Sequence, residues 1–240
     1  MGWFGLFGQK GPSQKAIDKQ VTHVKEQYAK PEYRQMAMDQ LLEWGTKESL
    51  KGLLSRFTVV VQSPHWDEEE KRWLVGEFAK RGDLAKEVLT EFLMTANEVT
   101  YVILALSRLC SEEELVSILQ AALRARLPED HRSSQSKMEL IAALEERQLP
   151  QLSEELLPYL DDHNDDVKCI TLDVLAAKKA DQAYASIARM ITESHHSARV
   201  LRHAASMVHK LEIPVDLKAP LAEEVTEDFV VRNGKLKPVR

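Results

Sequence analysis

The residues best suited to chemistry lie in two short segments of the C-terminal half of the chain. The first is LPYLDDHNDDVK at 157–168, where four aspartates surround His163. Carboxylates and imidazole bind metal ions, but a metal site needs several ligands in a defined geometry. Asp and Asn before a helix also cap the free N–H groups of its first turn and oppose the helix dipole. We therefore expect a helix start capped by Asn164, Asp165 and Asp166, and no metal site.

The second segment carries a cluster of histidines: His195, His196, His203 and His209. Glu193 and His196 form an E-x-x-H motif, which contributes ligands to di-iron sites in helical bundles. Such a site needs two of these motifs and two further glutamates, and the sequence has a single one. We expect these residues to open a helix whose histidines face solvent.

Other catalytic motifs are incomplete. Ser134 and Lys137 form S-x-x-K, but the S-D-N and K-T-G elements that accompany it in penicillin-recognising enzymes do not occur. The sequence also lacks a P-loop and the glycine-rich G-x-G-x-x-G pattern. We therefore predict no catalytic residue, no cofactor-binding residue and no cofactor.

Composition limits the class of protein. The chain has 240 residues, 44% of them apolar, and a formal net charge of −6. The acidic balance disfavours sequence-independent nucleic-acid binding, which needs a basic surface. Cys110 and Cys169 lie in apolar helical patterns without a CxxC motif, which predicts reduced thiols in a cytoplasmic protein. No apolar run approaches the ~20 residues that span a bilayer.

The N-terminal peptide MGWFGLFGQKG contains three aromatic residues, Trp3, Phe4 and Phe7. It lacks the features of a signal peptide, and Leu6 breaks the myristoylation pattern. The aromatic residues either fold back onto the first helices or form a peptide that docks on a partner or weakly on a membrane surface. We predict a flexible peptide over residues 1–12, with these three residues as candidates for partner binding.

Helical periodicity extends over residues 13–212, and the helices come in pairs. The first helix of each pair is expected to begin near 31, 67, 97, 132, 163 and 196. This period of roughly 30 to 36 residues is typical of helical repeats. Apolar or small residues recur four apart in these helices, as in the following stripes: Val167, Thr171 and Leu175; Val200, Ala204 and Val208. Each pair would bury its apolar face by stacking on its neighbours.

Residues 213–240 differ from the repeats. Asn233-Gly234 between short apolar and basic runs predicts a two-residue hairpin or an extended tail. Pro214 and Pro220 end the last helix and direct the chain back across it. We expect this tail to pack on the last repeat as a cap.

The segment NDDVKCITLDVLAAKKADQAYASIARMI at 164–191 resembles a HEAT repeat of the short bacterial type, which is related to the repeats of phycobiliprotein lyases. The residues that match the family pattern are Asp165, Asp166, Val167, Lys168, Leu175, Asp181, Ala183 and Ile187. Lys168 stands where the family usually has Arg, and Thr171 where it usually has Ala. The resemblance implies an all-α, right-handed α-solenoid of about six helical pairs.

A solenoid offers a long and mostly rigid surface, so we expect a non-catalytic scaffold or adaptor that binds another protein. Two alternatives follow from the resemblance. One is a phycobilin-lyase-like enzyme or chromophore-handling protein. The other is a HEAT-like DNA glycosylase. Such enzymes use aromatic residues near an Asp, and Trp66-Asp67 is weakly similar to that combination.

Overall fold

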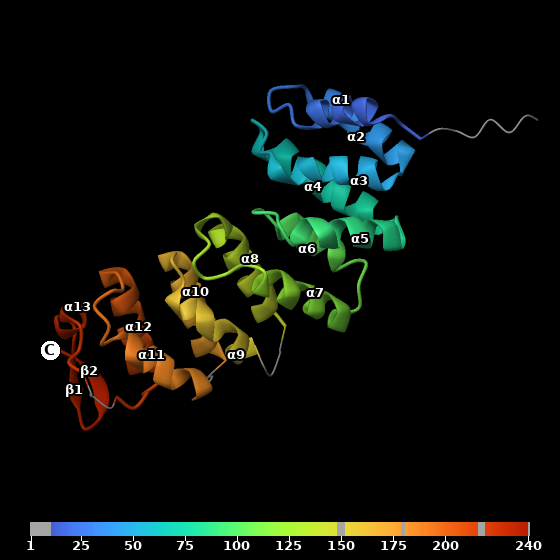
Figure 1. Cartoon of the computed structure of the whole chain (residues 1–240). Coiled ribbons are helices and arrows are strands. Elements are labelled where there is room, and N and C mark those ends of the chain that lie inside the picture. The colour runs from blue at the N-terminus through green and yellow to red at the C-terminus, as the bar shows by residue number, and fades with distance from the viewer. Residues whose placement is uncertain (1–10, 148–151, 179–180, 216–218, 240) are drawn as a thin grey trace, which may run out of the picture. The chain divides into compact units, whose positions relative to one another are not determined.

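The computed structural model describes residues 11–147, 152–178, 181–215 and 219–239, and most of them are helical (Figure 1). The α-helices are α1 (Gln14–Val24), α2 (Pro31–Trp44), α3 (Lys47–Leu53), α4 (Pro64–Ala79), α5 (Gly82–Leu93), α6 (Thr100–Leu106), α7 (Glu112–Arg124), α8 (Ser134–Glu145), α9 (Leu152–Leu156), α10 (Asp165–Ala177), α11 (Tyr184–Met190), α12 (Ala198–Lys210) and α13 (Glu223–Thr226). The 3₁₀ helices are η1 (Leu54–Thr58), η2 (His131–Ser133), η3 (Leu157–Asp161) and η4 (Asp181–Ala183). The predicted all-α class is confirmed.

The helices that open the six expected pairs begin 31 to 36 residues apart. They are α2, α4, α6, α8, α10 and α12, which start at Pro31, Pro64, Thr100, Ser134, Asp165 and Ala198. Each start lies within three residues of its predicted position. Both stripes predicted for the C-terminal pairs are buried: Val167, Thr171 and Leu175 in α10, and Val200, Ala204 and Val208 in α12. The local pattern therefore determines which helix face enters the core.

Local chemistry explains where several helices start and stop. Thr46 and Ser49 form a reciprocal capping box at the start of α3. Gly45 ends α2 with a φ of 58°, a left-handed conformation that glycine adopts without strain. Asn164 caps α10, because its side chain accepts hydrogen bonds from the N–H groups of Asp166 and Val167.

The chain divides into two compact units, Met1–Leu115 and Val116–Arg240. In the first unit, α2, α4 and α6 pack side by side in one layer, and α3 packs on α5 in the other. α1 covers α2 and α3 (Figure 1). Leu41, Leu50, Leu74, Phe78 and Leu89 fill the space between the layers and are fully buried.

In the second unit, α8, α10 and α12 form one layer. The second layer consists of η3, α9 and α11, which pack against the first. Each unit thus has the two-layer order that stacked helical pairs produce. A continuous right-handed solenoid through both units stays a prediction.

The C-terminal segment forms a hairpin of two antiparallel strands, β1 (Phe229–Arg232) and β2 (Lys235–Pro238). Asn233 and Gly234 make its turn with φ values of 53° and 69°, as an Asn-Gly hairpin requires. α13 and β2 contact α12, where the side chains of Val225 and Leu236 are buried. The backbone N–H of Ala222 also donates a hydrogen bond to the carbonyl of Ile191. This segment therefore covers the outer side of α12.

Candidate functional site

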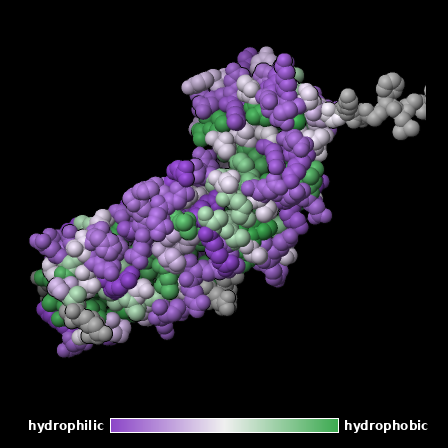
Figure 2. Space-filling model, viewed as in Figure 1, coloured by the Kyte–Doolittle hydropathy of each residue, from purple (hydrophilic) through white to green (hydrophobic). Residues whose placement is uncertain are grey.

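The three residues predicted to bind a partner, Trp3, Phe4 and Phe7, lie outside the described residues. Large apolar side chains nevertheless reach the surface elsewhere in the first unit. Tyr33 is 62% exposed, Met36 68% and Trp66 42%. Hydrophobic surface is visible among the hydrophilic side chains on the viewed face of this unit (Figure 2). A cluster of exposed apolar residues is more informative than single ones, because such patches mark binding surfaces.

Two of these residues line a groove of about 440 Å³ between α2 and α4. Its lining residues are Pro31, Glu32, Gln35, Met36, Trp66, Glu69, Glu70 and Trp73. Met36 also lines a second hollow of about 530 Å³ between α1 and α2, together with Tyr33. The apolar surface thus continues across α2. Exposed carboxylates of Glu32 and Glu69 lie beside the apolar groups and give the groove an acidic rim.

A buried charge network adjoins the groove, and one of its members, Glu70, lines the groove. Arg34 of α2 donates to both carboxylate oxygens of Glu70 in α4, with N–O distances of 2.7 to 3.2 Å. Arg56 of η1 donates to Glu70 over 2.8 Å and to Asp67 over 2.8 Å. Lys71 donates to the second oxygen of Asp67 over 2.7 Å. Because five charged groups pair within one site, α2, η1 and α4 are held in a fixed arrangement beside the groove.

Asp67 is fully engaged in this network. Burial alone would raise the pKa of its carboxyl group, but hydrogen bonds from Lys71 and Arg56 outweigh burial and lower it. Asp67 also accepts the backbone N–H of Val61. It is therefore an ionised structural group. In the Trp66-Asp67 pair that was weakly similar to a glycosylase site, Trp66 lines the groove, whereas Asp67 is engaged by Arg56 and Lys71.

The acidic segment of the second unit performs three different structural tasks. Asn164 is the N-cap of α10, as predicted. The prediction that Asp165 and Asp166 also cap the helix is wrong: they lie in its first turn, where they oppose the helix dipole. Asp162 is fully buried and pairs with Lys137 of α8, with Nζ and Oδ2 2.5 Å apart. Asp161 is exposed at the end of η3.

The buried pair also accounts for the S-x-x-K motif. The ammonium group of Lys137 donates to Asp162 and to the carbonyls of Leu127, Pro128 and Asp130. A lysine held by a carboxylate and three carbonyls has no free lone pair with which to act as a base. Lys137 is therefore a structural residue.

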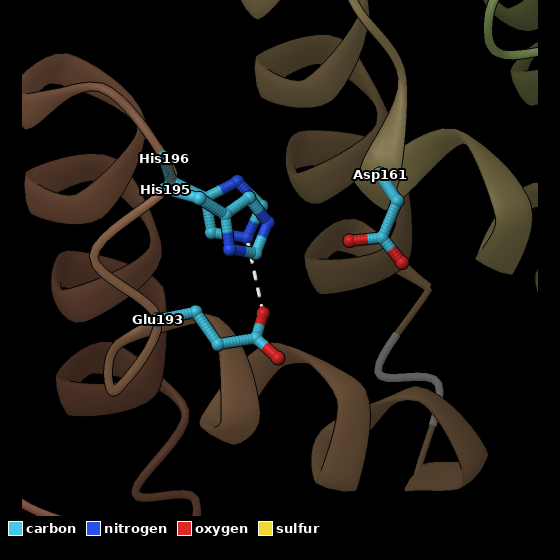
Figure 3. Close-up of side chains that lie close together, drawn as sticks. All are labelled: Asp161, Glu193, His195 and His196. Atoms are coloured by element: carbon cyan, nitrogen blue, oxygen red, sulfur yellow. Dashed lines mark hydrogen bonds and ion pairs between the residues drawn. The ribbon is translucent and has the colours of Figure 1, made fainter.

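The structure brings Asp161 close to the E-x-x-H segment. Asp161 points from η3 towards Glu193, His195 and His196, which lie in the loop between α11 and α12 (Figure 3). One ligand atom from each of the four residues lies within 4.8 Å of the others. Sequence reasoning missed this cluster, because its two parts are more than 30 residues apart.

His196 is the fixed member of the cluster. We predicted that it faces solvent at a helix start, and this is wrong: its side chain is buried in the loop before α12, between α10 and Glu193. Its Nδ1 lies 3.4 Å from Nζ of Lys168, and its Nε2 lies 3.2 Å from Oε2 of Glu193. Burial, followed by the neighbouring His195 and Lys168, lowers the pKa of His196. The imidazole is consequently neutral at physiological pH.

No helix within the described ranges is both long enough and apolar enough to cross a membrane. Comparison with known proteins identifies no relative, because no family model, no curated protein and no solved structure matches the chain.

Proposed function

We propose that this protein is a non-catalytic, HEAT-like helical-repeat scaffold that binds a partner protein through the groove between α2 and α4. The observation that carries the proposal is the combination of exposed Met36 and Trp66 with buried ion pairs to Glu70, which lines the same groove. A groove whose shape is already fixed loses little conformational entropy on binding. Aromatic side chains and Met are also enriched at protein interfaces.

The chemistry of the groove favours a peptide segment with an apolar anchor and basic flanks. Met36, Trp66 and Trp73 supply apolar contacts, and the carboxylates of Glu32 and Glu69 attract Lys or Arg. The same acidic rim disfavours the phosphate backbone of a nucleic acid. Cys110 and Cys169 form no disulfide, as is usual for thiols of a cytoplasmic protein, and burial raises the pKa of both thiols, which makes them less reactive.

The proposal is tested by selecting peptides from a random library displayed on phage against the intact protein. We expect enriched peptides to combine one aromatic or aliphatic residue with Lys or Arg. Their binding should be lost in Met36→Glu and weakened in Trp66→Ala. Leu127→Glu is the matched control, because Leu127 is an equally exposed apolar residue, 63% exposed, in the second unit. Selected peptides that bind Met36→Glu as well as the unaltered protein would refute this groove as the binding site.

A further inference from the structure

The cluster of Asp161, Glu193, His195 and His196 has the donor types of a transition-metal site. Two imidazoles and two carboxylates are ligands that Zn²⁺ accepts in a tetrahedral arrangement. In such an arrangement, neighbouring ligand atoms are about 3.3 Å apart, given metal–ligand distances of about 2.0 to 2.1 Å. The four atoms now lie within 4.8 Å of one another, so no separation has to shorten by more than about 1.5 Å. Asp161 and His195 are exposed, so their side chains have room for that adjustment.

The position of His196 departs from the pattern of ion pairs elsewhere in the protein. Arg34, Lys137 and Lys168 each occupy the fourth residue of a first helix, and all three are buried. Arg34 meets the carboxylate of Glu70, and Lys137 meets that of Asp162. The corresponding cation in α10, Lys168, instead meets an imidazole nitrogen. An imidazole is a weaker partner than a carboxylate for a buried ammonium group, but it is a metal ligand.

The hydrogen bonds define the form of His196 that would bind a metal. The Lys168 ammonium group can only donate, so Nδ1 of His196 accepts and Nε2 carries the ring proton towards Glu193. A metal ion at Nε2 would move that proton to Nδ1, with no net release of protons. Lys168 would then turn to Asp165, whose Oδ1 already lies 3.7 Å from its Nζ.

Arg189 currently supplies the positive charge at this site. Its guanidinium contacts Oδ2 of Asp161 over 3.1 Å and Oε1 of Glu193 over 3.2 Å. Its side chain is 55% exposed, so it can swing into solvent at small cost. A divalent cation would balance the two carboxylates more fully than one guanidinium.

We propose that Asp161, Glu193, His195 and His196 bind a divalent transition-metal ion of the zinc class, which displaces Arg189. Two histidine ligands favour zinc, cobalt or nickel over calcium and magnesium, which prefer oxygen. The ion would tie the corner after η3 to the loop before α12 and so join two neighbouring helical pairs of the second unit.

The experiment is a titration of the intact, metal-free protein with Co²⁺, followed by its visible absorption. We expect one equivalent to bind and to give the intense bands of a four- or five-coordinate ion. Asp161→Asn and His195→Ala should each weaken binding by at least about tenfold. Both residues are exposed, so these variants keep the fold, and their thermal unfolding checks it. Arg189→Met should bind Co²⁺ more tightly, because it removes the competing cation.

His163→Ala is the matched control. The ring centroids of His131 and His163 are 3.5 Å apart, so these two imidazoles are the alternative histidine pair in the same unit that the control must exclude. This variant should bind Co²⁺ as the unaltered protein does, and Zn²⁺ should raise the melting temperature of both. Three results would overturn the proposal: absence of Co²⁺ bands at millimolar metal, unchanged binding in Asp161→Asn and His195→Ala, or a loss confined to His163→Ala.

Discussion

Lys137 and Asp162 form an ion pair with both side chains fully buried, 25 residues apart in sequence and 2.5 Å apart in space. The pair joins α8 to the corner that precedes α10. Asp162 also accepts the backbone N–H of Asn164 through its other oxygen. One carboxylate thus fixes both the neighbouring helix and the residue that caps α10.

Removal of one partner from this pair should be strongly destabilising. In Asp162→Ala, the Lys137 ammonium group stays buried without its counter-charge, so we expect unfolding to become easier by about 3 to 5 kcal/mol. Urea denaturation of the second unit measures this loss. Asp166→Ala is the control, because Asp166 pairs with Arg199 on the surface and its loss should change stability little. Equal effects of the two substitutions would contradict the role assigned to Asp162.

Loss of the α10 cap should reduce stability by less than loss of the buried ion pair. Asn164→Ala removes the side-chain oxygen that accepts two N–H groups, which should cost about 0.5 to 2 kcal/mol. Asp165→Ala keeps that cap and should cost less. Thermal unfolding of the two variants at one pH gives the comparison. A greater loss in Asp165→Ala would transfer the capping role to Asp165.

The second unit should lose stability at alkaline pH because of Tyr159. Burial, with a smaller contribution from Asp162, raises the pKa of its phenol to about 12. The hydroxyl donates to the carbonyl of Leu123, so the folded state favours the neutral form. The unfolded phenol titrates near 10, so this stabilisation is complete below pH ~10 and is lost as pH rises towards ~12. Tyr159→Phe should flatten the decline in urea midpoint over that range, whereas Tyr28→Phe, at an exposed tyrosine, should leave it intact.

The C-terminal hairpin should stabilise the second unit. Leu236 of β2 is buried, and the carbonyl of this residue lies 3.0 Å from Nδ1 of His209 in α12. Leu236→Ala should therefore cost about 2 to 5 kcal/mol. Val239→Ala, at a residue that is 50% exposed, should have little effect. Deletion of residues 214–240 would uncover the apolar face of α12 and should cause aggregation, which light scattering detects.

Local chemistry alone determined the helices and their repeat. The i, i+4 stripe of Val167, Thr171 and Leu175 is a property of one helix, so it is readable without any partner. The same holds for the stop at Gly45, the cap at Asn164 and the turn at Asn233-Gly234, each of which involves only a few consecutive residues. These signals are short-range, and the structure bears them out.

The candidate sites depended on contacts between distant residues, which only the tertiary structure decides. Met36 and Trp66 meet at one groove because Arg34 and Glu70 fix α2 beside α4. Asp161 is adjacent in sequence to the residues at the start of α10, yet its carboxylate lies near the potential ligand atoms of Glu193, His195 and His196. The sequence did carry one clue, a cation at the fourth position of three first helices, but the partner of each cation lies 25 to 36 residues further along the chain. Spacing within a helix cannot reveal such a partner, because the packing of one helical pair on the next determines which side chains meet.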